Sequence, residues 1–183
     1  MSGLCIQRLI QLKYDQAFVA SATQEDYYRS KGAPEEILKY VRLTGKRFGE
    51  KDMESIAREF FNLEKRVESG HDHTKNGKKI EQKSSRYGAN GASFKWQHIE
   101  MKHQWDILLL CGLDFHSIKF WTVNRKNVES LIQQKYITGQ GAKDASGNAQ
   151  PQQAYWFSKS NIPIDIWNKN FIEIQSEQDL IDF

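Results

Sequence analysis

Residues 70–85, GHDHTKNGKKIEQKSS, are the stretch around which the fold of this chain is best understood. They predict a strand, a tight turn at Asn76-Gly77 and a second strand, because Asn-Gly tolerates the positive φ angles of a type I′ turn. Such a hairpin brings Asp72 back beside Glu81 and Lys83. We therefore expect two carboxylates and one ammonium group to converge at the end of the hairpin.

The alternation of side chains along an extended strand puts Glu81 and Lys83 on one face and Gln82 on the other. Two carboxylates placed in this way can hold a hard divalent cation. The ammonium group can orient a water molecule or stabilise negative charge. This combination suits phosphodiester hydrolysis.

The composition is that of a folded protein with a substantial core. The chain has 183 residues, of which 39% are hydrophobic, and its five tryptophans argue against disorder. The net charge of +3 is compatible with a polyanionic partner without requiring one. Cys5 and Cys111 form no disulfide framework, and no segment has the ~18 apolar residues of a membrane span. With no signal-peptide pattern, these features predict a cytoplasmic protein that does not associate with membranes.

Helices are expected before the hairpin, because apolar residues recur there at helical spacing. Pro34, followed by two glutamates, favours a helix start. Gly45 and Gly49 predict a break. The expected helices are residues 4–24, 35–43 and 52–68, and the first two make up a helical N-terminal part, residues 1–48.

Strands dominate after the hairpin. The apolar run at residues 105–113 predicts a strand covered on both faces, and the polar composition of residues 138–153 predicts a long loop. No linker or repeat interrupts the chain, so we expect one domain. The other expected elements are strands at 94–99, 117–123, 155–157 and 171–174, helices at 124–136 and 176–179, a catalytic core at 49–134 and C-terminal elements at 154–183 within the single domain 1–183.

The pattern Asp72-x(8)-Glu81-x-Lys83 resembles the active-site signature of the PD-(D/E)XK nuclease superfamily, and most of all that of its type II restriction endonucleases. The resemblance covers residues 49–134. It implies an α/β fold with a restriction-endonuclease-like core, in which helices flank a central mixed β-sheet. His71 stands where the family has a proline, and the short spacing of the two acids requires the tight turn.

The resemblance implies that Asp72, Glu81 and Lys83 are catalytic. Asp72 and Glu81 would be ligands of Mg²⁺, for which Mn²⁺ can substitute, and the carbonyl of Gln82 would complete the metal shell. Glu54, near the start of the preceding helix, would hold a water beside the metal or a second metal ion. The alternative is an exposed hairpin with ordinary surface charges and a solvated acid at a helix start.

His71 and His73 flank Asp72 and share a strand face, which makes zinc a second alternative. A structural zinc site normally has four ligands, and no Cys/His cluster completes one here. We expect these histidines to contact phosphate or simply to flank the strand.

DNA contacts are expected around the turn and on the segments that follow the second strand. Hydroxyl, guanidinium and phenol groups suit phosphate contacts, and Gln and Lys can reach base edges. The alternative for the later segment is an edge strand with polar outer positions. The expected DNA-binding residues are Lys75, Asn76, Ser84, Ser85, Arg86, Tyr87, Lys95, Gln97 and His98.

Taken together, the sequence predicts a Mg²⁺-dependent type II restriction endonuclease that cleaves double-stranded DNA at a short site. Two-fold symmetric sites are matched most simply by a homodimer. One alternative is a repair, recombination or mobile-element nuclease of the same superfamily that recognises DNA structure. Another is a non-catalytic DNA- or partner-binding module on the same scaffold.

Overall fold

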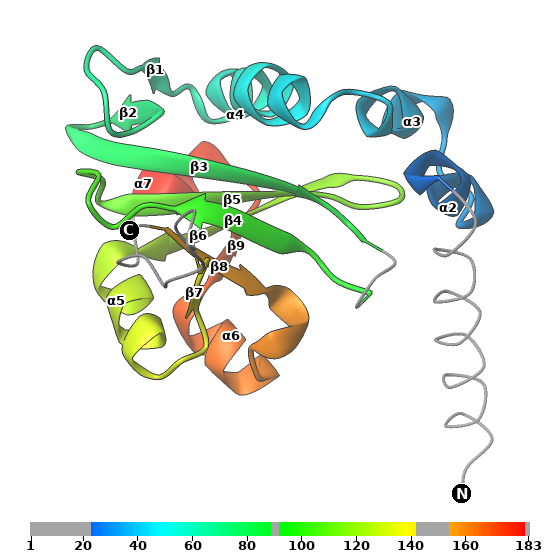
Figure 1. Ribbon diagram of the computed structural model, residues 1–183. Coiled ribbons are helices and arrows are strands. Elements are labelled where there is room, and N and C mark those ends of the chain that lie inside the picture. The colour runs from blue at the N-terminus through cyan, green and yellow to red at the C-terminus, as the bar shows by residue number, and fades with distance from the viewer. Residues whose placement is uncertain (1–22, 89–91, 142–153, 182–183) are drawn as a thin grey trace, which may run out of the picture.

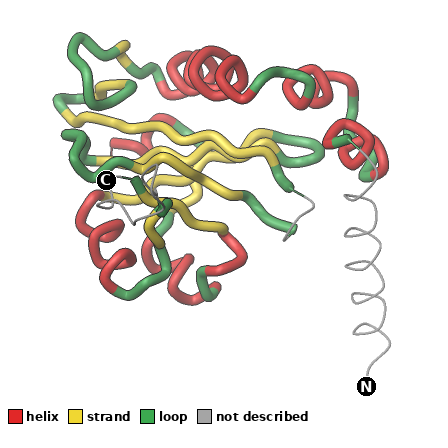
Figure 2. Tube along the Cα trace, viewed as in Figure 1, coloured by secondary structure: helices red, strands yellow, loops and turns green. Residues whose placement is uncertain are grey.

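A six-stranded mixed sheet forms the middle layer of the computed structural model, which describes residues 23–88, 92–141 and 154–181 (Figures 1 and 2). The strand order is β1-β2-β3-β5-β6-β9. Strands β3 and β5 pair in parallel, and every other neighbouring pair is antiparallel. The strands are β1 (Glu64–Lys65), β2 (His73–Lys75), β3 (Lys78–Arg86), β5 (Ile107–Leu113), β6 (Ile118–Asn124) and β9 (Ile172–Ile174).

Helices cover both faces of this sheet, which confirms the expected α/β class with a central mixed sheet. One face carries α2 (Gln24–Ser30), α3 (Glu35–Val41), the π-helix η1 (Arg47–Met53), α4 (Glu54–Phe61) and α7 (Glu177–Ile181). The other face carries α5 (Arg125–Gln133), η2 (Lys159–Asn161), α6 (Ile164–Asn170) and a small sheet of β4 (Lys95–Ile99), β8 (Tyr155–Ser158) and β7 (Thr138–Gly139). In Figure 1, α3 and α4 lie above the sheet, and α5 and α6 lie below it.

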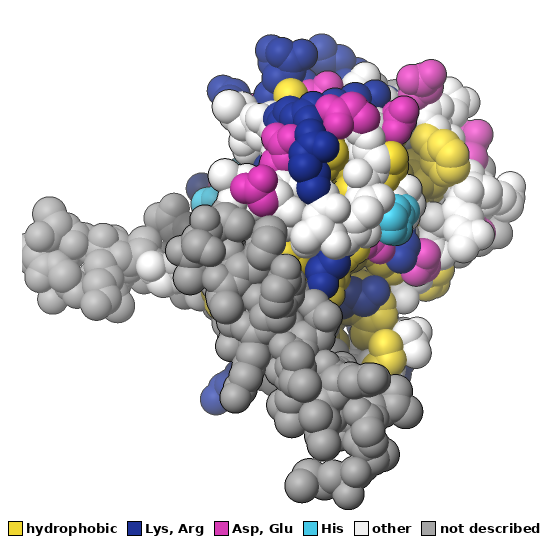
Figure 3. Space-filling view, turned by 90° about the vertical axis from the view of Figure 1, so that its right-hand side faces the viewer, with side chains coloured by type: hydrophobic (Ala, Val, Ile, Leu, Met, Phe, Trp, Pro, Cys, Tyr) yellow, Lys and Arg dark blue, Asp and Glu magenta, His cyan; other side chains and the backbone are white. Residues whose placement is uncertain are grey.

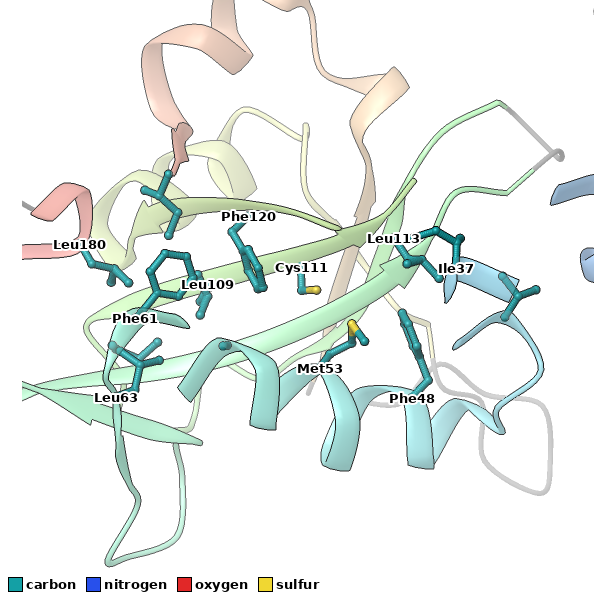
Figure 4. Packing of buried hydrophobic residues seen from close by; sticks show 14 of the residues in the cluster. Ile37, Phe48, Met53, Phe61, Leu63, Leu109, Cys111, Leu113, Phe120 and Leu180 are labelled. Carbon is teal, nitrogen blue, oxygen red and sulfur yellow. The ribbon is translucent and has the colours of Figure 1, made fainter. Parts of the chain in front are cut away.

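Two hydrophobic cores fill the spaces on either side of the sheet. Every residue of β5 is buried, as the apolar run predicts, and its side chains alternate between the cores. Leu109 packs with Phe61 and Phe120 in the core beneath the helices (Figure 4). Trp96, Trp121 and Trp167 gather in the opposite core.

The surface above the helical layer is rich in paired charges. In Figure 3, Lys and Arg side chains lie among Asp and Glu side chains at the top of the molecule. At the N-terminal end of this layer, Arg42 binds both Glu25 and Glu35, and Arg29 lies 2.7 Å from Glu25. Ion pairs so exposed contribute little stability each.

The hairpin is confirmed, with φ angles of 49° at Asn76 and 77° at Gly77. Asn76-Gly77 joins β2 to β3 in the register His73↔Ile80, Thr74↔Lys79 and Lys75↔Lys78. Positive φ at both central residues is the requirement of a type I′ turn.

The helices before the hairpin differ from the expectation in two ways. The break predicted at Gly45 and Gly49 is wrong, because helical structure runs from Gly45 into α4 through η1. The helix expected to reach residue 68 ends at Phe61, because Asn62 adopts the left-handed conformation at its C-cap.

Other differences lie at the ends of elements. The loop expected at residues 138–153 begins instead with β7, which pairs with β8, and α6 was not predicted. The expected helix at 4–24, Cys5 and most of that loop lie outside the described residues. In the part of the chain that the structure describes, no helix is long and apolar enough to cross a membrane.

Candidate active site

An open cavity of about 1100 Å³ runs along β3, between η1 and α4 on one side and β4 on the other. In Figure 1, α4 lies above β3 and β4 lies below it. The three residues expected to be catalytic line this cavity, and so do Glu54 and Gln82. The full lining is Gly45, Lys46, Gly49, Glu50, Lys51, Glu54, Ser55, Arg58, Lys65, Arg66, Gly70, His71, Asp72, Glu81, Gln82, Lys83, Ser84, Lys95, Gln97, His98 and His103.

Asp72 is fixed beside β3 by backbone hydrogen bonds. Its amide donates to the carbonyl of Ile80 at 2.9 Å, which continues the ladder one residue beyond β2. Its carboxylate Oδ2 accepts a hydrogen bond from the amide of Gln82 at 2.8 Å. The hairpin therefore places Asp72 across from Glu81, as the turn predicts.

Glu81 and Lys83 share the face of β3 that the alternation predicts. Lys83 Nζ donates to Glu81 Oε1 at 2.6 Å. Burial raises the pKa of Glu81, and the negative charge of Asp72 raises it further, while Lys83 acts in the opposite direction. Gln82 points away, and its side chain binds His73 at 2.8 Å on the opposite face.

Glu54 enters the cavity from the first residue of α4. Burial raises its pKa to about 7, and the negative charge of Asp72 adds to this effect. Arg58, one turn later, lies 3.5 Å from Glu54 and opposes both effects. Asp72 thus acts electrostatically on both glutamates.

The donor chemistry of this site fits a hard cation, because carboxylate and carbonyl oxygens are the ligands of Mg²⁺. Within residues 23–88, 92–141 and 154–181, however, no group of three Asp, Glu, His or Cys side chains could hold a metal ion. Two carboxylates, Asp72 and Glu81, and the main-chain carbonyl of Gln82 are then the candidate ligands. Glu54 is a carboxylate of the same cavity but not a member of a three-ligand group.

The two histidines do not form a shared metal pair. His73 is fully buried and bound to Gln82, and burial lowers its pKa, so the ring is neutral at neutral pH. His71 is also buried and lines the cavity, and its carbonyl accepts a hydrogen bond from Arg66 at 3.2 Å.

Four of the expected DNA-binding residues line the cavity, namely Ser84, Lys95, Gln97 and His98. A shift of register in β4 between Trp96 and Ile99, with a φ of 58° at His98, leaves both Gln97 and His98 exposed. β-Bulges commonly redirect side chains beside functional sites.

The other five expected DNA-binding residues do not line the cavity. The side chains of four of them bind other parts of the protein, which does not fit the expected phosphate contacts. Arg86 donates to the carbonyls of Tyr40 and Leu43, and its guanidinium lies 4.1 Å above the ring of Phe48. Lys75 is largely buried and binds Glu177 and the carbonyl of Asn62.

Ser85 is buried and bonded to the backbone of Arg86 and Lys95. Tyr87 donates its hydroxyl hydrogen to the carbonyl of Ala92 at 2.6 Å. Asn76 is exposed in the turn, away from the cavity lining.

Several cavity residues were missed by the sequence reasoning. Arg58 follows Glu54 by four residues, a spacing that puts both side chains on one helix face and could have identified it. Lys46 and His103 are brought to the cavity only by the tertiary fold. The basic residues of the lining are Lys46, Lys51, Arg58, Lys65, Arg66, Lys83 and Lys95, and its acidic residues are Glu50, Glu54, Asp72 and Glu81.

No protein-family model matches this chain, and no curated protein matches it either.

Proposed function

We propose that this protein is a Mg²⁺-dependent endonuclease of the PD-(D/E)XK type that hydrolyses phosphodiester bonds in double-stranded DNA. The observation that supports the proposal is the presence of Asp72, Glu81 and Lys83 in one cavity whose basic side chains outnumber the acidic ones. A polyanionic substrate would be attracted to such a lining, and the carboxylates of Asp72 and Glu81 suit a hard divalent cation.

Each residue has a distinct part in the proposed reaction. Asp72 and Glu81, with the Gln82 carbonyl, would hold Mg²⁺, which as a Lewis acid polarises the phosphoryl group. Lys83 would orient the attacking water and stabilise the negative charge that develops on the phosphate oxygens. Ser84 and Lys95 would contact the DNA backbone, and the exposed Gln97 and His98 would read base edges.

Cleavage at a short two-fold symmetric site, as by a type II restriction endonuclease, is the specific form of the proposal. A homodimer would place one active site on each strand, and the enzyme would act on DNA in the cytoplasm. Discrete bands from plasmid digestion support this form. Smears or branch-specific nicks would instead indicate the structure-specific nuclease.

The proposal is tested with Glu81→Ala and Lys83→Ala in a plasmid cleavage assay with Mg²⁺. Removing a charge-stabilising or metal-binding group should slow cleavage by roughly 100-fold or more. DNA binding should remain within a few-fold of the wild type. Lys126→Ala, a change at an exposed position of α5, is the matched control and should cleave normally.

A non-catalytic DNA-binding module is the second candidate. It is favoured by the absence of a three-residue metal group within the described ranges. Wild-type protein that binds plasmid but leaves it intact in both Mg²⁺ and Mn²⁺ would establish this candidate. Full cleavage by both variants would instead refute the assignment of the site.

A further inference from the structure

Three acidic side chains of the cavity each lie beside a basic side chain of the same cavity. Glu54 lies 3.5 Å from Arg58, and Asp72 lies 3.7 Å from Arg66. Glu81 lies 2.6 Å from Lys83. We call these six residues the paired charges.

The paired charges come from separate elements of the cavity wall. Arg58 stands on α4, and Arg66 stands on the segment between β1 and β2. Arg66 also donates from the same nitrogen to the carbonyl of His71, which holds it beside Asp72. A guanidinium has five donors, so Arg66 can keep this hydrogen bond and still bind another anion.

Each acid would gain from a stronger cation than its present partner. The Glu54–Arg58 and Asp72–Arg66 ion pairs have N···O distances of 3.5 and 3.7 Å. These distances are longer than those of strong charge-assisted hydrogen bonds. The side chains of Glu54 and Asp72 are only 20% and 16% exposed, so little water is left to solvate their charges. A divalent cation would supply twice the charge.

The two arginines, in turn, would gain from an anion other than their present carboxylate partners. Arg58 and Arg66 have the planar donor geometry that phosphate oxygens accept in pairs. While a carboxylate holds each of them, a phosphate must compete with that carboxylate and is also repelled by it. A cation that neutralises the acids removes both obstacles.

We propose that Arg58 and Arg66 are DNA-backbone contacts that exchange their carboxylate partners for phosphates when a divalent cation binds, so that cation and DNA bind cooperatively. This inference rests on the proposed function for the identity of the two ligands. Coupling between sites in proteins is commonly 5- to 150-fold, and we expect about tenfold here. By linkage, DNA should tighten cation binding by the same factor.

The experiment measures DNA affinity by fluorescence anisotropy, with a labelled duplex at constant ionic strength. Ca²⁺ is the cation, because it takes the same oxygen ligands, and the complex is checked for intact DNA. Wild-type protein should bind the duplex about tenfold more tightly with Ca²⁺ than without it. In Arg66→Gln and Arg58→Gln, Ca²⁺ should change the affinity by less than about threefold.

Lys65→Gln is the matched control. Lys65 precedes Arg66 and lines the same cavity, and no ion pair is found for it among the described residues. This variant should lose affinity by a similar factor with and without Ca²⁺, so that the tenfold effect of Ca²⁺ persists. Arg66→Lys keeps the positive charge and should therefore retain part of the gain in DNA affinity that Ca²⁺ causes.

The two proposals fail in different ways. If wild-type protein binds the duplex and Arg66→Gln and Arg58→Gln keep the full Ca²⁺ effect, the exchange is refuted and the nuclease proposal stands. A wild-type affinity that does not respond to Ca²⁺ also refutes the exchange. If wild-type protein does not bind the duplex under either condition, DNA is not the ligand and the proposed function itself falls.

Discussion

Single residues of the cavity owe their positions to the backbone as much as to side-chain contacts. The carboxylate of Asp72 accepts a hydrogen bond from the amide of Gln82, as a main-chain carbonyl of a neighbouring strand would. It therefore cannot turn away without breaking that hydrogen bond. Within the described residues Glu54 has no such backbone anchor, and its hydrogen-bond partner is the side chain of Arg58. We infer that Asp72 is the rigid acid of the site and that Glu54 is the adjustable one.

Glu54 should make the stability of the protein depend on pH. Its pKa is about 7 in the folded protein against 4.5 for the free group. The folded state therefore binds more protons, and stability falls as the pH rises through this range. Glu54→Gln carries no charge, so its stability relative to wild type should increase by roughly 2–3 kcal/mol between pH 4 and pH 8.

The measurement is urea unfolding of both proteins across that pH range. Groups remote from Glu54 contribute equally in the two proteins, so their contribution cancels in the difference. Parallel stability curves for wild type and Glu54→Gln would show that burial in this cavity does not disfavour the carboxylate.

The residues whose positions sequence reasoning predicted correctly are those placed by their neighbours in the chain. Glu81 and Lys83 are two residues apart on one strand, so alternation alone puts them together. Arg86 was misassigned because its partners, the carbonyls of Tyr40 and Leu43, lie more than 40 residues away. A basic side chain at the end of a strand looks the same in sequence whether it binds phosphate or caps a helix end.

At the scale of elements, the π-helix and the hairpin are two of those that shape the cavity. η1 contributes Gly49, Glu50 and Lys51 to the lining, immediately before Glu54. π-Helical segments are rare and are often found at functional sites. A Cβ added at Gly49 would lie 4.0 Å from the Cβ of Ser84, so the π-helix and β3 are neighbours there.

Gly77→Ala should weaken the hairpin that holds the two acids together. Gly77 has a φ of +77°, a conformation that costs an L-residue roughly 1–2 kcal/mol. We expect that loss in the free energy of unfolding, measured with urea. Gly45→Ala is the control, because Gly45 is helical and has open space at its Cβ position, so alanine there should be neutral or stabilising. Equal losses in the two variants would contradict the assigned turn.

Strong local sequence patterns made the hairpin and β5 predictable. The patterns in η1 and α6 were too weak or misleading for these helices to be predicted. Asn76-Gly77 specifies its turn, and the apolar run before Leu113 is too continuous for a surface segment. Two glycines suggested a break in the region that became η1, although packing against β3 keeps that region helical. α6 is only seven residues long and buries a single residue, Trp167, so it carries no periodic pattern.

For the whole molecule, Gly112 in β5 marks a tightly packed point of the core that contains Trp96, Trp121 and Trp167. A Cβ there would meet the rings of Phe94 and Trp121, each at 2.9 Å. Gly112→Ala should therefore overpack the core and destabilise the protein by about 1–3 kcal/mol. For a chain of this size we expect the thermal midpoint to fall by roughly 2–10 °C. A midpoint equal to that of wild type would show that Phe94 can move aside without loss.

The arrangement of layers was predictable in kind and not in detail. The continuous apolar run at residues 105–113 indicated a strand covered on both faces, and β5 is buried between the two cores. The separate sheet of β4, β8 and β7 could not be foreseen, because β4 pairs with β8 across more than 50 residues. The cavity depends on this pairing, since β4 forms one of its walls.

The hairpin also has a consequence for the order in which the protein folds. Hairpins close in roughly 1–10 μs, whereas parallel pairing of distant strands is much slower. Asp72 and Glu81 are nine positions apart, but Ile80 must find Ile107 to begin the β3–β5 ladder. The two carboxylates should therefore meet early, while water still screens their repulsion. The rest of the sheet then closes around a pair of like charges that is already in place.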